Sequence, residues 1–294
     1  MNTSVAVVIL NTNRMDDTLR CIASVYTSYY GEHGCEIYVI DNGCTDGSNS
    51  AIKSAFPRVN IISTLVDEGY AGNNNYGIFA SNISSKYLFI VNEDAYFLED
   101  ALGTLIHYME CNDAVGIIGP TIVNESNTGV VQANGCVLNR DFTVYWRDCN
   151  QRVEMLEQQA EAVDWVHGCG FMIRTSLFLE LGGFWKELYY TWEEVDICVR
   201  AKGLGYGVMV HPAAKLAHRD NPGKPGIRNQ YYMSRNRLLF MKRHADTLLF
   251  VREYARIARK AIKSSVTTGW RSAQPLWCSL IDVVLKSTGK CRWF

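Results

Sequence analysis

The sequence lacks several features that would assign it to a particular class of protein. Its 294 residues contain no run of 18 or more uncharged apolar residues, so it predicts no membrane-spanning helix. The first residues have neither the basic start nor the small-residue cleavage site of a signal peptide, and we expect a cytoplasmic location. No GxGxxG motif follows the first predicted strand, which argues against a dinucleotide-binding oxidoreductase.

The ten cysteines show no CxxC spacing, which argues against the usual kinds of zinc site. Several of them lie in apolar runs, such as Cys198 in DICVRA, and we expect reduced and mostly buried thiols. Internal repeats and low-complexity segments are also lacking. The remaining composition is that of a globular protein with a sizeable core.

Acidic residues are scarce in the last third of the chain. Residues 1–200 hold 11 Lys and Arg against 26 Asp and Glu, whereas residues 201–294 hold 18 against 4. The positive excess indicates an anionic partner, for which a nucleotide diphosphate, an anionic lipid and a nucleic acid all qualify. No nucleic-acid-binding motif is present and the acidic first two-thirds would repel phosphates, so we predict no nucleic-acid partner.

The first hundred residues alternate between two periodicities. Short β-branched apolar runs, typical of buried parallel strands, occupy residues 5–10, 36–41, 59–63 and 87–91. Helical stretches separate them at residues 16–29, 46–56 and 71–83. This order predicts an open α/β sheet, with ligands bound beyond the carboxyl ends of its strands. Further helices are expected at residues 191–202 and 229–244, and in a tail that we expect Pro275 to interrupt.

Small polar or acidic residues follow each of the four strands. They are found in Asn11-Thr12-Asn13-Arg14, in the loop that begins at Asp41, in residues 67–75 and in Asn92-Glu93-Asp94. Four such ends in succession favour a shared polar site, although turns also prefer these residue types. A carboxylate after residue 91 could hold a hard cation, or it could belong to a polar strand-ending turn.

A second acidic cluster, Glu193, Glu194 and Asp196, lies at the start of a predicted helix. The helix dipole favours carboxylates there, which is a purely structural explanation. The aromatic approach to this cluster would instead place one carboxylate in a partly apolar pocket and raise its proton affinity toward that of a general base. His218 follows another strand-like run and is either a surface residue or a metal ligand paired with a carboxylate.

Taken together, these segments resemble family 2 of the inverting glycosyltransferases, in its bacterial rhamnosyltransferase-like branch with a GT-A fold. The resemblance covers about residues 5–242 and rests on six segments in the family's order. They are VAVVILNTNR, VIDNGCTDGS, DEGYAGNNNYG, IVNEDAYF, the long run from GCGFMIR to YYTWEEVDICVR, and YYMSRNRLLF. Each segment is weak evidence alone, whereas six in order are specific. The implied fold is an open mixed α/β sheet flanked by helices, with a helical C-terminal extension.

The resemblance implies roles for particular residues. Asp94 and His218 are expected to bind a divalent metal, Mn²⁺ or Mg²⁺, that bridges the donor diphosphate. Glu194 matches the catalytic base, with Glu193 and Asp196 as alternatives, because the family has Asp where this chain has Glu194. The family's first metal-region Asp is Asn92 here, which leaves the ligand set open. The expected donor-binding residues are Asn11, Asn13, Asp41, Asn74, Glu93 and Arg235, and the expected acceptor-side residues are His167, Gly168 and Trp192.

The implied activity is the metal-dependent transfer of a sugar, with inversion, from dTDP-rhamnose or a UDP-hexose. The acceptor would be a hydroxyl of a glycan or a lipid-linked molecule in bacterial surface polysaccharide synthesis. The alternative is a non-catalytic carbohydrate- or nucleotide-binding protein on the same fold. The oligomeric state is left open.

We predict a GT-A domain over residues 1–246, with a nucleotide-binding half at 1–115 and an acceptor-binding, catalytic half at 116–246. Residues 247–294 form a basic tail with nine Lys and Arg, together with Trp270, Trp277, Trp293 and Phe294. Such a tail favours docking on an anionic membrane, which would put the protein at the inner face of the cell membrane. A helical lid packed on the core is the alternative.

Overall fold

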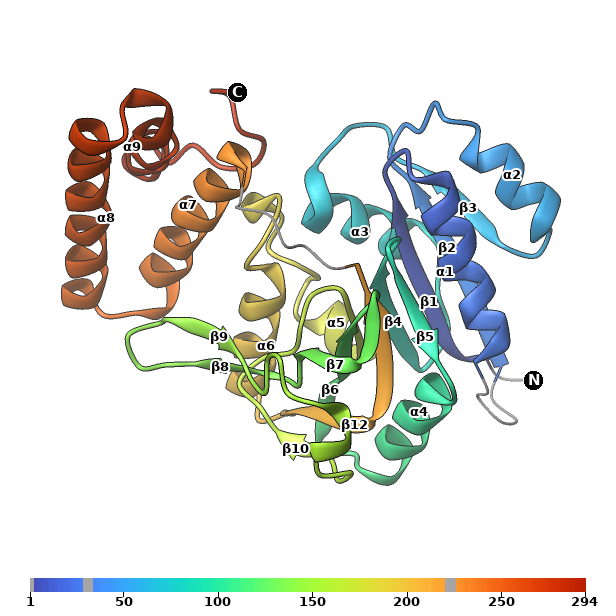
Figure 1. The fold of residues 1–294 in the computed structure, drawn as a ribbon. Helices are drawn as coiled ribbons and strands as arrows, with labels where there is room; N and C mark the ends of the chain where they lie inside the picture. The colour runs from blue at the N-terminus through green and yellow to red at the C-terminus, as the bar shows by residue number, and fades with distance from the viewer. Residues whose placement is uncertain (1–2, 29–33, 220–225) are drawn as a thin grey trace.

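A computed structural model describes residues 3–28, 34–219 and 226–294. Its centre is a ten-stranded mixed sheet with the order β10-β12-β6-β11-β4-β1-β2-β3, while β5 pairs with β12 and β7 with β6 (Figure 1). The strands are β1 (Thr3–Asn11), β2 (Gly34–Asp41), β3 (Asn60–Ser63), β4 (Tyr87–Asn92), β5 (Ala95–Leu98), β6 (Val115–Asn124), β7 (Asn127–Ala133), β10 (Glu161–Ala162), β11 (Gly170–Arg174) and β12 (Gly207–His218).

The first half of the sheet is parallel, as its sequence pattern predicts. Strands β3, β2, β1 and β4 run side by side in the same direction, and residues 5–9 of β1 are almost fully buried. Helices α1 (Met15–Thr27) and α2 (Ser48–Ala55) lie to one side of β1 and β2 in Figure 1, and α3 (Gly69–Ala80) lies to the other. Apolar side chains on both faces of these strands therefore form the core.

The second half joins the first through an antiparallel strand. Strand β11 is antiparallel to both β4 and β6, and β12 is parallel to β6. The segment between β6 and β12 contributes α5 (Thr175–Glu180), α6 (Glu193–Gly203) and the short hairpin of β8 (Cys136–Leu138) and β9 (Val144–Trp146). Helix α4 (Ala101–Cys111) and the 3₁₀ turns η1 (Val153–Met155) and η2 (Lys186–Leu188) complete this part. The predicted open mixed sheet flanked by helices is confirmed.

A helical extension follows the sheet. Helices α7 (Ile227–His244), α8 (Thr247–Thr267) and α9 (Trp270–Val284) pack against one another at one end of the molecule (Figure 1). The prediction that Pro275 interrupts the tail is wrong, because Pro275 lies within α9. A proline removes one helical hydrogen bond, and here tertiary packing on a buried face outweighs that loss. The break occurs at Gly269, whose φ of 85° suits glycine.

None of the helices in the described part of the chain has the length and apolar character needed to cross a lipid bilayer.

Candidate active site

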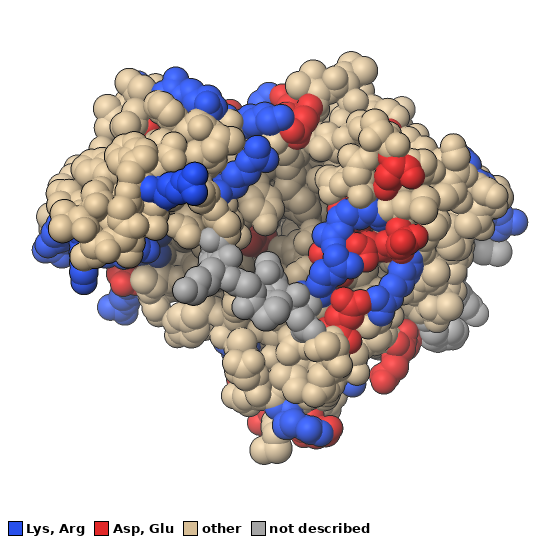
Figure 2. Space-filling view, turned by 45° about the horizontal axis from the view of Figure 1, so that its top comes forward, with Lys and Arg blue, Asp and Glu red and all other residues tan. Residues whose placement is uncertain are grey.

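The carboxyl ends of the parallel strands meet at one edge of the sheet. Asn11 is in register with Asp41, Asp41 with Ser63, and Leu10 with Asn92. A cavity of about 440 Å³ opens at this edge, between the loops of the sheet and helix α7. Figure 2 shows a hollow in this face, with Lys and Arg side chains gathered around it and acidic side chains interleaved on one side.

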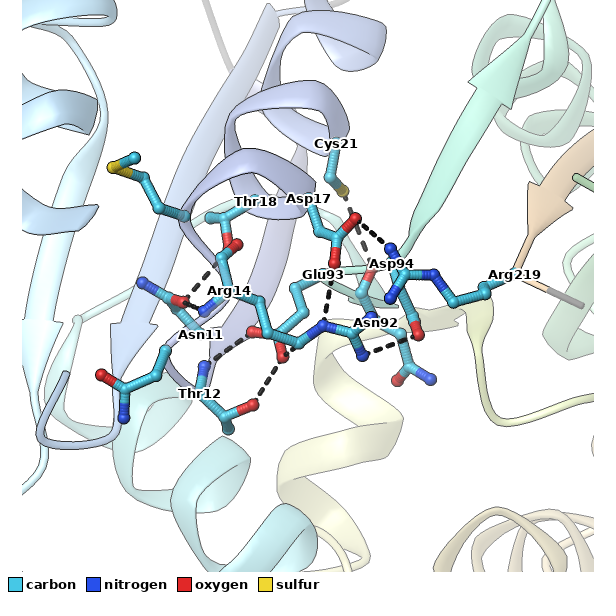
Figure 3. A network of polar contacts seen from close by, with 12 residues as sticks. Asn11, Thr12, Arg14, Asp17, Thr18, Cys21, Asn92, Glu93, Asp94 and Arg219 are labelled. Atoms are coloured by element: carbon cyan, nitrogen blue, oxygen red, sulfur yellow. Dashed lines mark hydrogen bonds and ion pairs between the residues drawn. The ribbon is translucent and has the colours of Figure 1, made fainter. Parts of the chain in front are cut away.

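The acid pair Glu93–Asp94, directly after β4, forms one wall of the cavity. Glu93 accepts hydrogen bonds from the backbone N–H and the hydroxyl of Thr12, at 2.6 and 2.5 Å, and so ties the β4 loop to the β1 loop (Figure 3). Burial raises the pKa of Glu93 to about 7 against the lowering effect of these bonds and of Arg14. Glu93 therefore lies in the cavity wall with its oxygens already engaged by Thr12.

Asp94 is held among cationic or polar partners. Arg14 Nη1 lies 3.0 Å from its Oδ2, and His218 Nε2 lies 3.5 Å from its Oδ1. Burial would raise the pKa of Asp94, but the His218 hydrogen bond and the charges of His218 and Arg14 outweigh it, so the pKa lies below its ordinary value. Asp94 is consequently a carboxylate at neutral pH, as a metal ligand must be.

His218, at the end of β12, is oriented by a second residue. Its Nδ1 lies 2.8 Å from Gln132 Oε1 on β7, and an amide oxygen can only accept a hydrogen bond. When the ring is neutral, this bond places the proton on Nδ1 and leaves Nε2 free to bind a metal, whereas a protonated ring also donates from Nε2 to Asp94. Within the described residues no three His, Cys, Asp or Glu side chains gather as possible metal ligands, and Asp94 and His218 face each other as a pair.

The second acid pair, Glu193–Glu194, has a different environment at the start of α6. Glu193 is buried, Glu194 is half-buried, and the Oε2 of each has no hydrogen-bond partner among the described residues. Burial raises the pKa of Glu194 to about 7 against its backbone hydrogen bonds. Burial and the neighbouring Glu194 raise the pKa of Glu193 well above its ordinary value. The pair can therefore gain or lose a proton near neutral pH.

The two acid pairs lie near the same two tyrosines of the cavity. Tyr70 and Tyr190 both line the cavity, and after burial the charges of Glu193, Glu194 and Asp94 raise the pKa of each tyrosine. The tyrosines are thus near both pairs, although the pairs lie about a hundred residues apart in the sequence.

His167 and Gly168 connect the same groups. The His167 ring is 5.7 Å from the His218 ring, and burial followed by the charge of His218 lowers the pKa of His167 to about 3. A Cβ on Gly168 would lie 3.2 Å from the Glu194 carboxyl carbon. The structure therefore brings together Asp94, His218, His167, Gly168 and Glu194, as the sequence-based hypothesis requires.

The turn that precedes α6 has an unusual backbone. Tyr189, Thr191 and Trp192 have φ values of 66°, 66° and 75°, which cost free energy for non-glycine residues. Asn236 on α7 donates hydrogen bonds to the carbonyls of Leu188, Tyr190 and Thr191, at 2.8, 2.7 and 3.0 Å. Helix α7 thereby holds the turn that presents the second acid pair to the cleft.

Arg235 does not face the donor cavity, contrary to the prediction. It is 1% exposed, and its guanidinium donates to the carbonyls of Leu188 and Gly289, at 2.8 and 2.7 Å. Its role in the structure is to satisfy backbone carbonyls of the turn and of the last segment of the chain, as a buried cation requires.

Asp196 and Trp192 are also placed differently from the prediction. Asp196 is fully buried on α6 and accepts hydrogen bonds from Arg200 at 2.6 Å and His244 at 2.9 Å, which occupy its oxygens. It therefore cannot reach an acceptor hydroxyl in this conformation. Trp192 is 3% exposed and packs on Phe240 with ring centroids 5.2 Å apart, so it belongs to the core rather than to an acceptor surface.

Three predicted donor-binding asparagines make local contacts instead of lining the cavity: Asn11 and Asn13 lie at the end of β1 and in the turn that follows it, and Asn74 lies within helix α3. Asn11 is fully buried and its amide donates to Ser48 at 2.8 Å. Asn13, which is exposed, accepts from the Thr45 backbone N–H at 2.7 Å. Asn74 is fully buried and donates to the Tyr70 carbonyl at 2.9 Å. Asn residues are frequent in such turns because their amides substitute for backbone partners.

Asp41 organises the loop after β2. Its two oxygens accept hydrogen bonds from the Cys44 backbone N–H, Asn49 and Ser63, at 2.8, 2.7 and 3.1 Å. Burial would raise the pKa of Asp41, but these bonds outweigh it and the pKa lies below its ordinary value. The neighbouring Asn42 lines the cavity, and contact between Asp41 and a nucleotide stays a prediction.

The sequence reasoning missed several cavity residues. Arg14 follows the first strand, so its position at a strand end was an available signal. Tyr70 and Tyr190 lie within the recognised segments DEGYAGNNNYG and YYTWEEVDICVR, but neither was named as a site residue. Arg228, Lys290 and Phe294 also line the cavity, and their contribution depends on how the helical extension folds back, which no local pattern indicates.

The fold and the cavity define a class of protein: a GT-A glycosyltransferase, with the polar site at the carboxyl edge of its parallel strands. The mannosyltransferase PcManGT from Pyrobaculum calidifontis, solved with GDP-Man and Mn²⁺, has the same fold. Its TM-score is 0.61 at 14% identity, over 97% of this chain and 88% of that chain.

The chain belongs to glycosyltransferase family 2, whose model matches residues 6–182. It is 22% identical over 206 residues to the N-acetylglucosaminyl-diphospho-decaprenol L-rhamnosyltransferase of Mycobacterium tuberculosis, covering 64% of this chain and 67% of that protein. It is 24% identical over 247 residues to the dTDP-rhamnosyl transferase RfbF of Shigella flexneri, covering 76% of each. These relatives confirm the rhamnosyltransferase-like branch, and the protein is a glycosyltransferase.

Proposed function

We propose that the enzyme transfers rhamnose or a hexose, with inversion, from a nucleotide-sugar donor to a hydroxyl of a glycan or lipid-linked acceptor. The observation that carries this proposal is that Asp94, which lines the cavity and is ionised, and Glu194, whose pKa is about 7, both lie near the cavity tyrosines Tyr70 and Tyr190. Residues 1–115 would bind the nucleotide, and residues 116–246 would bind the acceptor and supply the base.

Glu194 is the proposed general base. Its carboxylate takes the proton of the acceptor hydroxyl while that oxygen attacks the anomeric carbon from the face opposite the nucleoside diphosphate. The bond from the anomeric carbon to the diphosphate oxygen breaks in the same step, which inverts the configuration. A base whose pKa is about 7 is ionised in a useful fraction of molecules and still binds the proton well. Burial and the neighbouring Glu194 also favour the protonated form of Glu193.

Asp94 and His218 are the proposed ligands of Mn²⁺ or Mg²⁺. Their facing Oδ1 and Nε2 atoms, with the proton of the neutral His218 ring held on Nδ1 by Gln132, fit a divalent cation. When bound, the metal would neutralise charge that develops on the departing diphosphate. Arg14, which contacts Asp94, would add a fixed positive charge in the same place.

The proposed donor class rests on the names of the relatives and is no more specific than those names. One relative's name specifies a dTDP-rhamnosyl transferase, and another's an N-acetylglucosaminyl-diphospho-decaprenol acceptor. We therefore propose dTDP-rhamnose or a UDP-hexose as donor and a glycan or a lipid-linked sugar as acceptor, as in bacterial surface polysaccharide synthesis.

Thermal unfolding in the presence of nucleotides tests the proposal first. A ligand that binds only the native state raises the melting temperature, so dTDP, UDP or their sugars should stabilise the protein, and more strongly with Mn²⁺. NMR of the product of a reaction with lipid-diphosphate GlcNAc as acceptor should then show the anomeric configuration inverted. Donor binding without transfer to any acceptor would support a non-catalytic binding protein instead, and retained configuration would refute the single displacement.

We further propose that helix α8 docks on an anionic membrane, where a lipid-linked acceptor would lie. Leu248, Ile262 and Val266 are 59%, 54% and 82% exposed, and the exposed Arg259 and Lys263 lie between them. Residues spaced in this way share one helix face, so apolar and basic side chains point outward together.

The aromatic residues of the tail contribute less to this face than the sequence suggests. Trp270 is 61% exposed. The Trp277 indole donates to Ser265 at 3.2 Å and the Trp293 indole donates to Asp282 at 2.8 Å, so both are held within the helical extension. The proposed contact therefore rests on the aliphatic and basic residues of α8 and on Trp270.

Vesicle flotation measures this contact. With roughly a third of anionic lipid, the protein should float with the vesicles, and the double change Ile262→Ser and Val266→Ser should leave it in the lower fractions. Met155→Ser, which changes an equally exposed apolar residue on another face, is the matched control. Equal flotation of the double variant and the wild type would refute docking through α8.

A further inference from the structure

The last residues of the chain return to the donor cavity. After α9 ends, residues 289–294 run between α7 and the turn before α6, and Lys290, Cys291 and Phe294 line the cavity together with Asp94 and Tyr190. The proposed metal ligand and the end of the helical extension thus border one space, although nearly two hundred residues separate them. We call residues 289–294 the C-terminal strap.

The first half of the strap is fixed through its backbone. Gly289 donates its N–H to the Glu187 carbonyl at 2.8 Å and accepts from Arg235 at 2.7 Å. Cys291 donates its N–H to the Tyr232 hydroxyl at 2.7 Å. The backbone is therefore held on both sides of Lys290, and Arg235 ties the strap to the same turn that presents the second acid pair.

The second half of the strap is fixed through its side chains. Arg292 and Trp293 both contact Asp282 of α9, at 2.9 and 2.8 Å, and Asp282 also accepts from the buried Tyr231 hydroxyl. The Phe294 ring packs edge-on against the Tyr231 ring with centroids 5.7 Å apart. The strap is consequently a built part of the structure, and Lys290 is its one charged side chain that lines the cavity.

Lys290 can leave Asp67 while the Asp67 carboxylate keeps other hydrogen-bond donors. Its Nζ lies 2.8 Å from Asp67 Oδ2, in an ion pair at the cavity mouth where Lys290 is 63% exposed. Asp67 also accepts from the Tyr189 hydroxyl at 2.8 Å and from the Gly69 N–H at 3.1 Å. These two bonds remain when the lysine turns toward another anion, so the exchange costs little.

The charges of the cavity show which anion this would be. Among the described residues, the acids that line the cavity are the ionised Asp67 and Asp94 and the partly ionised Glu93, and its cationic side chains are Arg14, Arg228 and Lys290. A nucleotide sugar adds the two negative charges of its diphosphate, and the proposed divalent metal offsets these two. Loss of one cation would then remove a positive charge from beside the donor, in a partly enclosed site where charges interact strongly.

We propose that Lys290 binds the diphosphate of the donor and that the C-terminal strap forms one wall of the donor site. This inference rests on the proposed function. Lys290 releases Asp67 when the nucleotide enters and contacts the phosphate oxygens, while Arg235 holds the strap in register with the turn before α6. The donor site is therefore completed by residues beyond the segment that matches the family model.

Calorimetric titration of dTDP and UDP, each with Mn²⁺, tests the role of Lys290. Lys290→Met should weaken binding of the nucleotide that the wild type binds by roughly tenfold or more, and Lys290→Arg should retain most of it. Lys286→Met, an exposed lysine four residues earlier that does not line the cavity, should bind as the wild type does. Unchanged melting temperatures would show that the folds are intact.

The double variant Lys290→Met with Asp67→Asn separates direct contact from mere neutralisation of Asp67. Binding that stays weak supports contact between Lys290 and the diphosphate, whereas recovery to the wild-type value refutes it. If the wild type and Lys290→Met bind the nucleotide equally well, the role of Lys290 is refuted and the proposed function is not. A wild type that binds no nucleotide diphosphate overturns the proposed function and this inference together.

Alkylation of Cys291 gives a second measurement that needs no substitution. Cys291 is half-buried at the cavity, whereas Cys111 and Cys149 are exposed elsewhere. Saturating nucleotide with Mn²⁺ should slow labelling of Cys291 at least severalfold and leave Cys111 and Cys149 unchanged, as followed by mass spectrometry. Equal labelling of Cys291 with and without bound nucleotide would refute the placement of the strap in the donor site.

Discussion

Asp94 and the Glu193–Glu194 pair all lie near Tyr70 and Tyr190 of the cavity, yet burial has opposite outcomes for their proton affinities. Glu93–Asp94 lies beside Arg14, His218 and the Thr12 hydroxyl, and Asp94 keeps its charge despite burial. Among the described residues, no cationic side chain forms an ion pair with Glu193 or Glu194, and the pKa values of both are raised. Similar residue types thus yield a fixed negative charge at Asp94 and exchangeable protons at Glu93, Glu193 and Glu194, because the strength of neighbouring charges and hydrogen bonds decides whether burial prevails.

The largest effect should come from removing the exchangeable proton site. Glu194→Gln keeps the size and polarity of the side chain but cannot accept a proton, so kcat should fall about a thousandfold while donor binding stays within about twofold. Single-turnover kinetics and nucleotide titration measure the two quantities. Glu180→Gln, on the exposed end of α5, is the control. Normal turnover of Glu194→Gln would give the role of base to another residue.

Removing His218, which lies beside Asp94, should have a smaller effect on activity, and this effect should depend on the Mn²⁺ concentration. His218→Ala removes one of the two proposed ligands, and kcat/KM should fall about a hundredfold at limiting Mn²⁺, with part of the activity restored by excess metal. His107→Ala changes an exposed histidine on α4 and should behave as the wild type does. Loss of activity that is independent of the Mn²⁺ concentration would argue that His218 acts without a metal.

The pH dependence of kcat should show the smallest of the three effects. Because Glu194 must be ionised to act and its pKa is about 7, kcat should drop by up to about tenfold per pH unit as the pH falls below that value. A flat profile between pH 5 and 7, once metal binding is saturated, would contradict a base of this pKa.

The same titration has a consequence for stability. A carboxyl whose pKa is raised by folding binds its proton more tightly in the native state, so its contribution is present at low pH and is lost as the pH rises through about 7. The free energy of unfolding should therefore decline between about pH 5 and 8, and less steeply in Glu194→Gln. Denaturant titrations at several pH values measure this difference.

Much of the first half of the fold could be predicted from sequence. The four apolar runs became parallel strands because their residues are buried on both faces, and the polar residues after them reached one edge because parallel strands share a direction. Asp94, Glu194 and His218 were identified through the resemblance to the family, and the structure places them near one cavity. Local pattern was sufficient for the strands and helices, whereas the roles of Asp94, Glu194 and His218 stay predictions.

Prediction was weaker for polar side chains that can face either a ligand or the interior of the protein. Asn11, Asn74, Asp196 and Arg235 have the polar chemistry of ligand-binding residues, but each one faces inward and satisfies backbone or charged groups. Nothing in the linear pattern distinguishes a polar residue that meets a ligand from one that meets a carbonyl. The difference depends on which face of its element the tertiary packing covers.

The sequence by itself determined the alternation of strands and helices, the family, and the residue types available for metal binding and proton transfer. Only the tertiary structure decided which acid stays charged, because pKa values depend on partners as distant in the chain as Arg14, Asp94 and His218. It also decided that Lys290 reaches the donor cavity, since the strap returns through contacts with α7 and α9. Such contacts join residues far apart in sequence, and their geometry exists only after the chain has folded.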